Sequence, residues 1–248
     1  MTEMTRGVYR LGDDAVSFYA LVEEGEVTLV DAGLPIHYRQ LTELLGGIGR
    51  SVQDVRAVLL THAHLDHVGL AERLRQEAGA IVWAHARDVP ALANPRRTPP
   101  EAKPEANLGA YLLRHPTALR APLHMARSGA LRTPGITTAS SFSGGETLDV
   151  PGRPHVVAVP GHTPGSVVFH LPSQGVVFTG DALVTHDGLI GRTGPQLIGP
   201  VFSHDTTQAR VSLENLVALD ADLILPGHGE PFRGPITDAV QQARLTSF

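Results

Sequence analysis

Three histidines and an aspartate lie within six consecutive positions of the sequence, at His62, His64, Asp66 and His67. Imidazole and carboxylate groups suit zinc, iron or manganese, and the chain has no cysteine that could supply sulfur ligands. In an extended segment residues i and i+2 point the same way, so His62 and His64 can converge on one ion. Asp66 and His67, beyond the turn, can face another. The segment therefore predicts a metal site with positions left for water, as catalysis requires.

Four further segments end an apolar run with a glycine close to an aspartate or a histidine. Glycine lets the backbone turn tightly, so that the neighbouring side chain can be aimed into a cleft at the strand ends. We therefore expect five loops to converge on one site. The four segments are 30–33, 160–165, 179–181 and 226–229, and they carry Asp31, His162, Asp181 and His228.

The elements that must position these loops follow from the hydrophobic periodicity. The first half alternates apolar strands with helical spacing, which indicates an α/β layered fold. Two β-rich halves that each end in helix predict a two-sheet sandwich covered by helices on both sides. Strands are expected at 16–22, 27–30, 58–60, 81–84, 147–150, 155–159, 166–171, 175–178 and 223–225, and helices at 38–48, 70–78, after an Asp205 cap, and at 236–245.

Residues 87–143 differ from the rest, because repeated prolines break any long element and only short helices, at 108–113 and 118–131, are expected. Within 87–132, eight Arg or Lys residues face three Asp or Glu residues. This helical insertion is interpreted either as a solvated arm or as a lid that contacts an anionic or amphiphilic substrate. Its apolar residues could line a pocket, form a homodimer contact or pack within the insertion; they are Leu108, Tyr111, Leu112, Leu119, Leu123 and Met125.

Composition excludes several classes of function. The chain of 248 residues is 42% hydrophobic and carries a formal charge of -5, which gives no basic field for nucleic acid. The absence of cysteine excludes disulfides, iron–sulfur clusters and thiolate nucleophiles. No apolar run approaches the roughly 18 residues of a membrane span, and the first residues lack the pattern of a signal peptide. We expect one domain over residues 1–248, located in the cytoplasm, without membrane insertion and acting on a small molecule.

In their order, and over nearly the whole chain outside 87–143, these motifs resemble the metal-binding motifs of the metallo-β-lactamase superfamily. The resemblance implies an αββα four-layer sandwich with the site at one edge between the sheets. It also implies two divalent metal ions, expected to be zinc, although iron and manganese suit the same ligands. The implied ligands are His62, His64 and His162 for the first ion and Asp66, His67 and His228 for the second, with Asp181 bridging both and Asp31 orienting the ligand loop.

Two metals held in this way lower the pKa of a shared water, so that a hydroxide nucleophile exists at neutral pH. We expect this hydroxide to attack a polarised carbonyl while Asp66 orients the water and moves the proton. The expected reaction is hydrolysis of an ester-type bond in a thioester, a lactone or a carboxylic ester.

Within the superfamily, the chain is more similar to the glyoxalase II and lactonase branches than to true β-lactamases, which usually lack the bridging aspartate and are exported. Glyoxalase II enzymes carry a sizeable C-terminal helical region, whereas 20 residues follow His228 here. Many lactonases have a tyrosine three residues after the bridging aspartate, where this chain has Val184. RNA-processing members would need a basic exosite for phosphates, and the basic excess of the insertion is too small to provide one.

Two alternatives remain open. Some similar proteins bind a single iron and oxidise persulfides with a subset of these ligands, and others are non-catalytic metal-binding modules that commonly lose ligands. His186 and His204 flank residues 188–200, which are expected to form a glycine-rich loop, and this makes them candidate pocket residues. The remaining histidines are interpreted as structural or surface residues.

Overall fold

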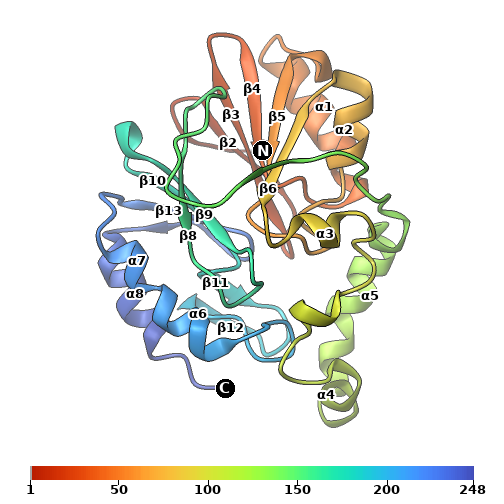
Figure 1. Cartoon of the computed structure of the whole chain (residues 1–248), viewed down its shortest axis with the longest axis vertical. Helices are drawn as coiled ribbons and strands as arrows, with labels where there is room; N and C mark the ends of the chain where they lie inside the picture. Colours follow the sequence, from red (N-terminus) through yellow and green to blue (C-terminus); the bar gives the residue numbers. More distant parts are fainter. Residues whose placement is uncertain (1) are drawn as a thin grey trace.

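The computed structural model describes residues 2–248, and most of its strands belong to two sheets (Figure 1). The first sheet has the order β1-β2-β3-β4-β5-β6-β7. Its early strands pair antiparallel up to β4, and the pairs from β4 to β7 are parallel. The strands are β1 (Thr2–Thr5), β2 (Val8–Gly12), β3 (Ser17–Glu23), β4 (Glu26–Val30), β5 (Val55–Leu59), β6 (Ile81–His85) and β7 (Ser140–Phe142).

The second sheet has the order β14-β13-β10-β9-β8, and a separate hairpin follows β10 in the chain. Within the sheet only the β10–β13 pair is parallel. The strands are β8 (His155–Ala158), β9 (Val167–Leu171), β10 (Val176–Gly180), β13 (Leu223–Pro226) and β14 (Phe232–Arg233), and the hairpin consists of β11 (Val184–Asp187) and β12 (Arg192–Gln196).

The two sheets pack face to face over one apolar cluster that contains Tyr19 and Leu59 from the first sheet and Phe169 and Phe178 from the second. The rings of Tyr19 and Phe178 meet across this interface with centroids 5.3 Å apart. Successive residues of a strand point to opposite faces, so Val168 leaves this cluster and joins the core on the other side of the sheet. Strands buried on both faces explain the continuous apolar runs of the sequence.

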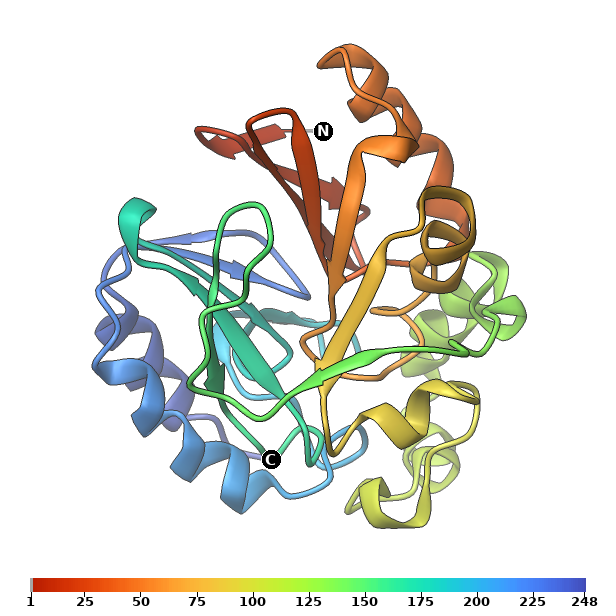
Figure 2. The ribbon, with the colours of Figure 1, turned by 45° about the horizontal axis from the view of Figure 1, so that its top comes forward.

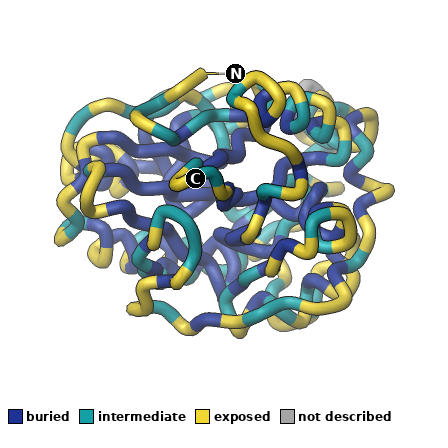
Figure 3. The backbone as a smooth tube through the Cα atoms, turned by 90° about the horizontal axis from the view of Figure 1, so that it is seen from above, coloured by how far each residue is buried: buried dark blue, intermediate teal, exposed yellow. Residues whose placement is uncertain are grey.

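Helices cover the outer face of each sheet, as Figure 2 shows. On the first sheet, Leu45 of α1 (Tyr38–Gly47) and Leu74 of α2 (Ala71–Ala78) share a buried cluster with Leu29. The second sheet is covered by α6 (Thr206–Ser212), α7 (Glu214–Val217) and α8 (Ile236–Arg244). Buried backbone therefore runs through the centre of the molecule in Figure 3, and the predicted α/β class with an αββα sandwich is confirmed. No helix within residues 2–248 is long and apolar enough to cross a membrane.

Between β6 and β7 the chain forms α3 (Val89–Leu92), α4 (Leu108–Arg114) and α5 (Arg120–Arg127), together with short 3-10 turns. Helices α4 and α5 lie at the lower right edge in Figure 1, away from the second sheet's helices. None of the residues described in α4 and α5 is buried. The predicted short helices at 108–113 and 118–131 are therefore present, the second one divided by turns.

The structure corrects three expectations. Residues 147–150 do not form a strand and contribute one isolated bridge, Thr147 to His155, because the chain turns back at once through residues with positive φ. Residues 140–142 were expected within the insertion, but they form β7 beside β6. The sequence did not predict this strand, because a short strand that begins with two serines has no hydrophobic signature. The insertion is therefore residues 87–139. The segment 188–200 contains β12 of a hairpin and is not wholly a loop.

Candidate metal centre

The loops that carry the predicted ligands leave the same ends of their strands. Asp31 directly follows β4 and Asp181 directly follows β10, while His62, His162 and His228 follow β5, β8 and β13 within four residues. Strands β4 and β5 are parallel, as are β10 and β13, so their carboxyl ends meet at one edge of the sandwich. This is the edge where open α/β folds place their ligands.

The first group of ligand atoms comes from His62, His64, His162 and Asp181, whose donor atoms lie within 4.8 Å of one another. Nδ1 of His64 lies 3.1 Å from Nε2 of His62 and 2.9 Å from Nε2 of His162. Oδ2 of Asp181 is 3.3 Å from Nε2 of His162 and 3.8 Å from Nε2 of His62. The i and i+2 histidines thus converge as predicted, and His162, which the resemblance assigns to the same ion, joins them from the other sheet.

The second group comes from Asp66, His67 and His228, with donor atoms that also lie within 4.8 Å of one another. Oδ2 of Asp66 is 3.4 Å from Nε2 of His228 and 3.8 Å from Nε2 of His67. Both rings also approach Asp181, His67 at 3.3 Å from Oδ1 and His228 at 3.2 Å from Oδ2. Asp181 therefore lies between the two groups, in the position predicted for a bridging carboxylate.

The chemistry of these donors fits a pair of divalent ions. Nε2 of His67 and Oδ1 of Asp181 are buried without a hydrogen-bond partner, an arrangement that is costly unless a metal takes their lone pairs. Two imidazole nitrogens bound tetrahedrally to one zinc lie about 3.3 Å apart, given Zn–N bonds near 2.0–2.1 Å. The nitrogens of the first group are separated by nearly this distance, so the cage has the size of such an ion.

Burial lowers the pKa of His62, His64 and His162, since their cations would lose contact with water. These rings are neutral, the form in which imidazole binds a metal. Burial would also lower the pKa of His67 and His228, but the surrounding carboxylates, with Asp181 foremost, together outweigh it. The pKa of His67 is raised well above its ordinary value, and that of His228 is raised to about 9. A metal that enters the second group must therefore displace protons.

Asp31 occupies the position expected of an orienting residue. Its Oδ2 lies 2.8 Å from Nδ1 of His67, which leaves Nε2 of that ring facing the site. Its Oδ1 accepts the backbone N–H of Thr61 at 2.8 Å, and the Thr61 hydroxyl lies 3.1 Å from Nδ1 of His62. The backbone of Asp31 is left-handed, with φ of 60°, a conformation that aspartate tolerates better than most residues. The carboxylate of Asp31 thus orients a histidine of each group, His67 directly and His62 through Thr61.

The loop of His228 is fixed from the first sheet. Nδ1 of His228 donates to the carbonyl of Ala15, which aims Nε2 at the site. The backbone N–H of Ser17 donates to the carbonyl of Gly227 at 2.7 Å. A Cβ at Gly227 would lie 2.5 Å from Oδ1 of Asp181, so only glycine lets this loop approach the bridging carboxylate.

Asp88 is a residue of the site that the sequence did not single out. It is buried, and its carboxylate accepts the backbone N–H of Ala63 at 3.1 Å and of Gly165 at 2.8 Å, and the hydroxyl of Thr163 at 2.8 Å. It therefore ties the loop of His62 and His64 to the loop of His162. An acidic residue three positions after β6 at the start of a proline-rich stretch gave no signal beyond its charge.

The two candidate pocket histidines lie outside both ligand groups. His186 is in β11, opposite Thr193 of β12. His204 donates its backbone N–H to the carbonyl of His162 at 3.0 Å, and its ring Nδ1 lies 3.1 Å from the carbonyl of Lys103 in the insertion. His204 thus connects the insertion to a ligand loop, and a role of either ring in a pocket stays a prediction.

An αββα sandwich with a histidine and aspartate cluster at one edge defines a metallo-hydrolase type of fold and site. Residues 11–228 match the family model described as the metallo-beta-lactamase superfamily, and the chain belongs to that superfamily.

Two curated relatives and one solved structure illustrate the similarity. The probable metallo-hydrolase YflN of Bacillus subtilis is 28% identical over 94% of this chain and 87% of its own length. The hydroxyacylglutathione hydrolase GloC of Haemophilus influenzae is 29% identical over 71% of this chain and 69% of its own. The crystal structure of a metallo-beta-lactamase family protein from Thermus thermophilus is 26% identical, covers 98% of this chain and 79% of that chain, and has a TM-score of 0.70. Superfamily membership and the ligand cluster together support a metal-dependent hydrolase.

Proposed function

We propose that this chain is a hydrolase that binds two divalent metal ions and cleaves an ester-type bond in a small molecule. The observation that carries the proposal is the pair of ligand groups with Asp181 between them. The first ion would be held by His62, His64 and His162, and the second by Asp66, His67 and His228. Two ions bound in this way supply a water of lowered pKa and an electrophile for a carbonyl oxygen.

The chain's own residues would carry the remaining steps. Asp66 is partly exposed, and its Oδ2 lies 3.4 Å from Nε2 of His228 at the open side of the second group. A carboxylate at this place can accept a proton from an attacking water and return it to the leaving group. Asp31 and Asp88 hold the ligand loops in place, so that little reorganisation is needed during the reaction.

The ester-type bond is supported by the nucleophile that the metal site would supply and by the relatives. The chain has no cysteine, and water is the nucleophile that such a metal site provides. The relative GloC is named as a hydrolase of a hydroxyacylglutathione, which is an ester-type substrate. Thioesters, lactones and carboxylic esters are therefore the first substrates to test.

The test is the metal content per chain, measured by elemental mass spectrometry on protein purified without chelator, followed by hydrolysis assays on those three substrate types. We expect near two equivalents of zinc, or of mixed zinc, iron and manganese, and an activity that a chelator removes and added metal restores. One equivalent of iron with oxygen uptake on glutathione persulfide would replace the proposal with a persulfide dioxygenase. A chain that binds no metal, even when metal is added, would contradict it and favour a binding module.

A further inference from the structure

A small cavity lies directly beside the metal centre, between the sandwich and the insertion. His64 and Thr163 line it on the side of the sandwich, and Asp88 and residues of segment 95–102 line it on the side of the insertion. A substrate whose reactive bond lies over the first ligand group would direct one of its substituents into this cavity. The cavity is therefore the place beside the site where a substituent of the substrate would meet the insertion.

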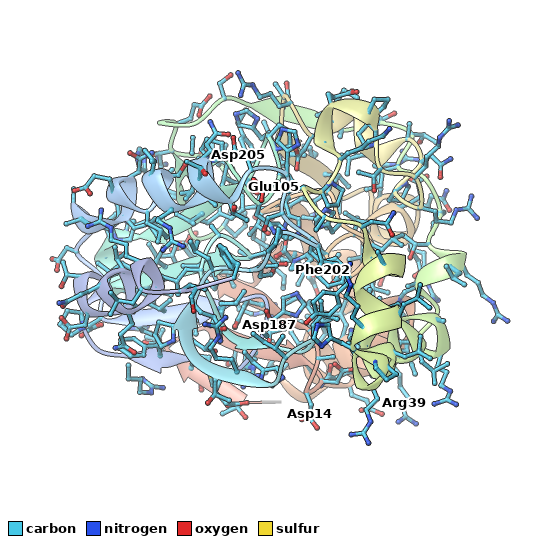
Figure 4. All side chains as sticks on the ribbon, turned by 90° about the horizontal axis from the view of Figure 1, so that it is seen from below. Asp14, Arg39, Glu105, Asp187, Phe202 and Asp205 are labelled. Atoms are coloured by element: carbon cyan, nitrogen blue, oxygen red, sulfur yellow. The ribbon has the colours of Figure 1, made fainter. Side chains whose placement is uncertain are left out.

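The insertion side of the cavity is held in place by the loop that supports His162. Beyond segment 95–102, Glu105 donates its backbone N–H to Ser203 at 3.0 Å, and its carboxylate accepts the hydroxyl of Thr206 at 2.8 Å. Glu105 and Asp205 lie close together in Figure 4, where these two segments meet. The hydroxyl of Ser203 in turn lies 3.4 Å from Nδ1 of His162. The cavity wall is thus built before any ligand binds, which favours selective binding.

The cavity lining holds one arginine, Arg97, and one carboxylate, Asp88, and the two are not paired with each other within the described residues. Within residues 2–248 no carboxylate lies within ion-pair distance of Arg97. Asp88 also lines the cavity, but both of its oxygens already accept hydrogen bonds from the two ligand loops. The insertion as a whole carries an excess of basic residues over residues 87–132, which attracts anions toward this side of the site.

We propose that the substrate of this site carries an anionic group, of the carboxylate type, and that Arg97 recognises this group in the cavity while the ester-type bond lies over the metal ligands. The inference rests on the proposed hydrolase function and names its substrate class. Arg97 is exposed, so the ion pair with the substrate would contribute selectivity of a few-fold and not the whole affinity. Neutral and cationic esters would bind more weakly.

Direct binding tests the inference without turnover. The probes are N-butanoyl-β-alanine, which carries a carboxylate, and its neutral primary amide; in both, an amide bond replaces the ester-type bond. Their dissociation constants are measured by NMR titration on the metal-loaded protein and on the variants Arg97→Glu and Arg96→Glu. Arg96 is the matched control, because it is exposed, adjacent and outside the cavity lining.

We expect the wild-type protein and Arg96→Glu to bind the carboxylate about fivefold more tightly than the amide, which is the upper end for an exposed ion pair. Arg97→Glu should lose this preference. A preference that persists in Arg97→Glu would overturn the inference, because the metal centre itself would then select the charge. Equal binding of both probes to the wild-type protein would overturn it as well.

Hydrolysis of the matching thioesters, S-butanoyl-3-mercaptopropionate and its primary amide, separates this inference from the proposed function. Absence of metal-dependent hydrolysis together with Arg97-dependent binding of the carboxylate would contradict the hydrolase and leave the anion site supported. Equal kcat/KM for both thioesters in the wild-type protein and in Arg97→Glu would support the hydrolase and overturn the anion site.

Discussion

His62, His67, His162 and Asp181 of the metal centre are buried, whereas none of the residues described in α4 and α5 of the insertion is. The charges differ in the same way. The carboxylates of the centre each face a histidine or a backbone donor, while none of the Arg and Lys residues of 87–132 forms an ion pair with a carboxylate within residues 2–248.

This difference indicates that the two regions have different roles, metal binding for the sandwich loops and substrate preference for the insertion. Groups that bind metal must be held within narrow limits, and the sandwich achieves this by placing them on loops between well-packed strands. A surface segment with few buried contacts can change in sequence without loss of the fold, so it is suited to set substrate preference. Substitutions in the two regions should therefore separate activity, stability and selectivity.

The largest effect is expected from the open side of the metal centre. Asp66→Ala and His228→Ala should each lower kcat/KM by about 10²–10⁴-fold, because the proposed function makes Asp66 the proton-transferring group and His228 a metal ligand. Folding should be retained, as measured by circular dichroism. His155→Ala, a histidine of β8 outside both ligand groups, is the control and should keep full activity. Undiminished hydrolysis by folded Asp66 and His228 variants would contradict the mechanism.

Asp88 should combine an effect on stability with an effect on metal binding. Asp88→Ala leaves the N–H groups of Ala63 and Gly165 and the hydroxyl of Thr163 without their acceptor, at a cost of about 2–3 kcal/mol in unfolding free energy. Affinity for the first metal should fall by about 10–100-fold, as for other residues that orient ligands. Urea unfolding and zinc competition with a chromophoric chelator measure the two effects.

The matched control for Asp88 is Asp149→Ala, which removes a fully exposed carboxylate at the surface. It should change neither quantity. Asp88→Asn keeps the shape of the side chain and should restore part of the stability. Zinc affinity that is equal in Asp88→Ala and in the wild-type protein would show that the two ligand loops are held without this carboxylate.

Asp13 links the insertion to the loop that holds His228, and it should show a smaller, pH-dependent effect. Its Oδ1 accepts the N–H groups of Ala15 and Val16, and its Oδ2 lies 3.2 Å from His37 and 2.9 Å from His124 of α5. Burial raises the pKa of Asp13, but its hydrogen bonds with His37 and the backbone outweigh this and hold it well below its ordinary value. The ionised form is therefore the one that stabilises the fold.

Because the pKa is depressed in the folded state, this stabilisation is present above the ordinary aspartate pKa of about 4 and is lost as the pH falls through the folded pKa. Asp13→Ala should lower the unfolding free energy by about 1 kcal/mol at pH 7, and the difference from the wild-type protein should narrow below about pH 4. Urea unfolding across this pH range measures it, with the exposed neighbour Asp14→Ala as control (Figure 4). A difference in unfolding free energy between the wild-type protein and Asp13→Ala that stays constant with pH would show that the charge of Asp13 does not stabilise the fold.

The smallest effect is expected on the outer face of the insertion. Leu113 is 88% exposed, so Leu113→Ser should change the unfolding free energy by less than about 0.5 kcal/mol, whereas Leu45→Ala in α1 should cost about 2–5 kcal/mol. Thermal melting at two protein concentrations measures this. A clear loss of stability in Leu113→Ser that depends on protein concentration would show that a second copy covers this face, which is the homodimer contact left open in the sequence analysis.

The sequence alone predicted the types of the candidate ligands and their order along the chain, and it determined the α/β class. Ligand identity depends on side-chain chemistry, and strand and helix periodicity depends on neighbours in sequence, so both can be read locally. His62 and His64 illustrate this, since their convergence follows from extended geometry over three residues. The Asp205 cap is another local feature, and its carboxylate accepts the N–H of Gln208 as predicted.

Tertiary structure decided what depends on segments far apart in the chain. Asp88 joins two ligand loops, His228 is held by Ala15, and β7 pairs with β6 across the whole insertion, and none of these has a signature in its own segment. The cavity beside His64, with Arg97 in its lining, likewise exists only once the insertion packs against the sandwich. The physical reason is that burial and hydrogen-bond partners are properties of the packed molecule, whereas a sequence pattern reports only which residues could take part.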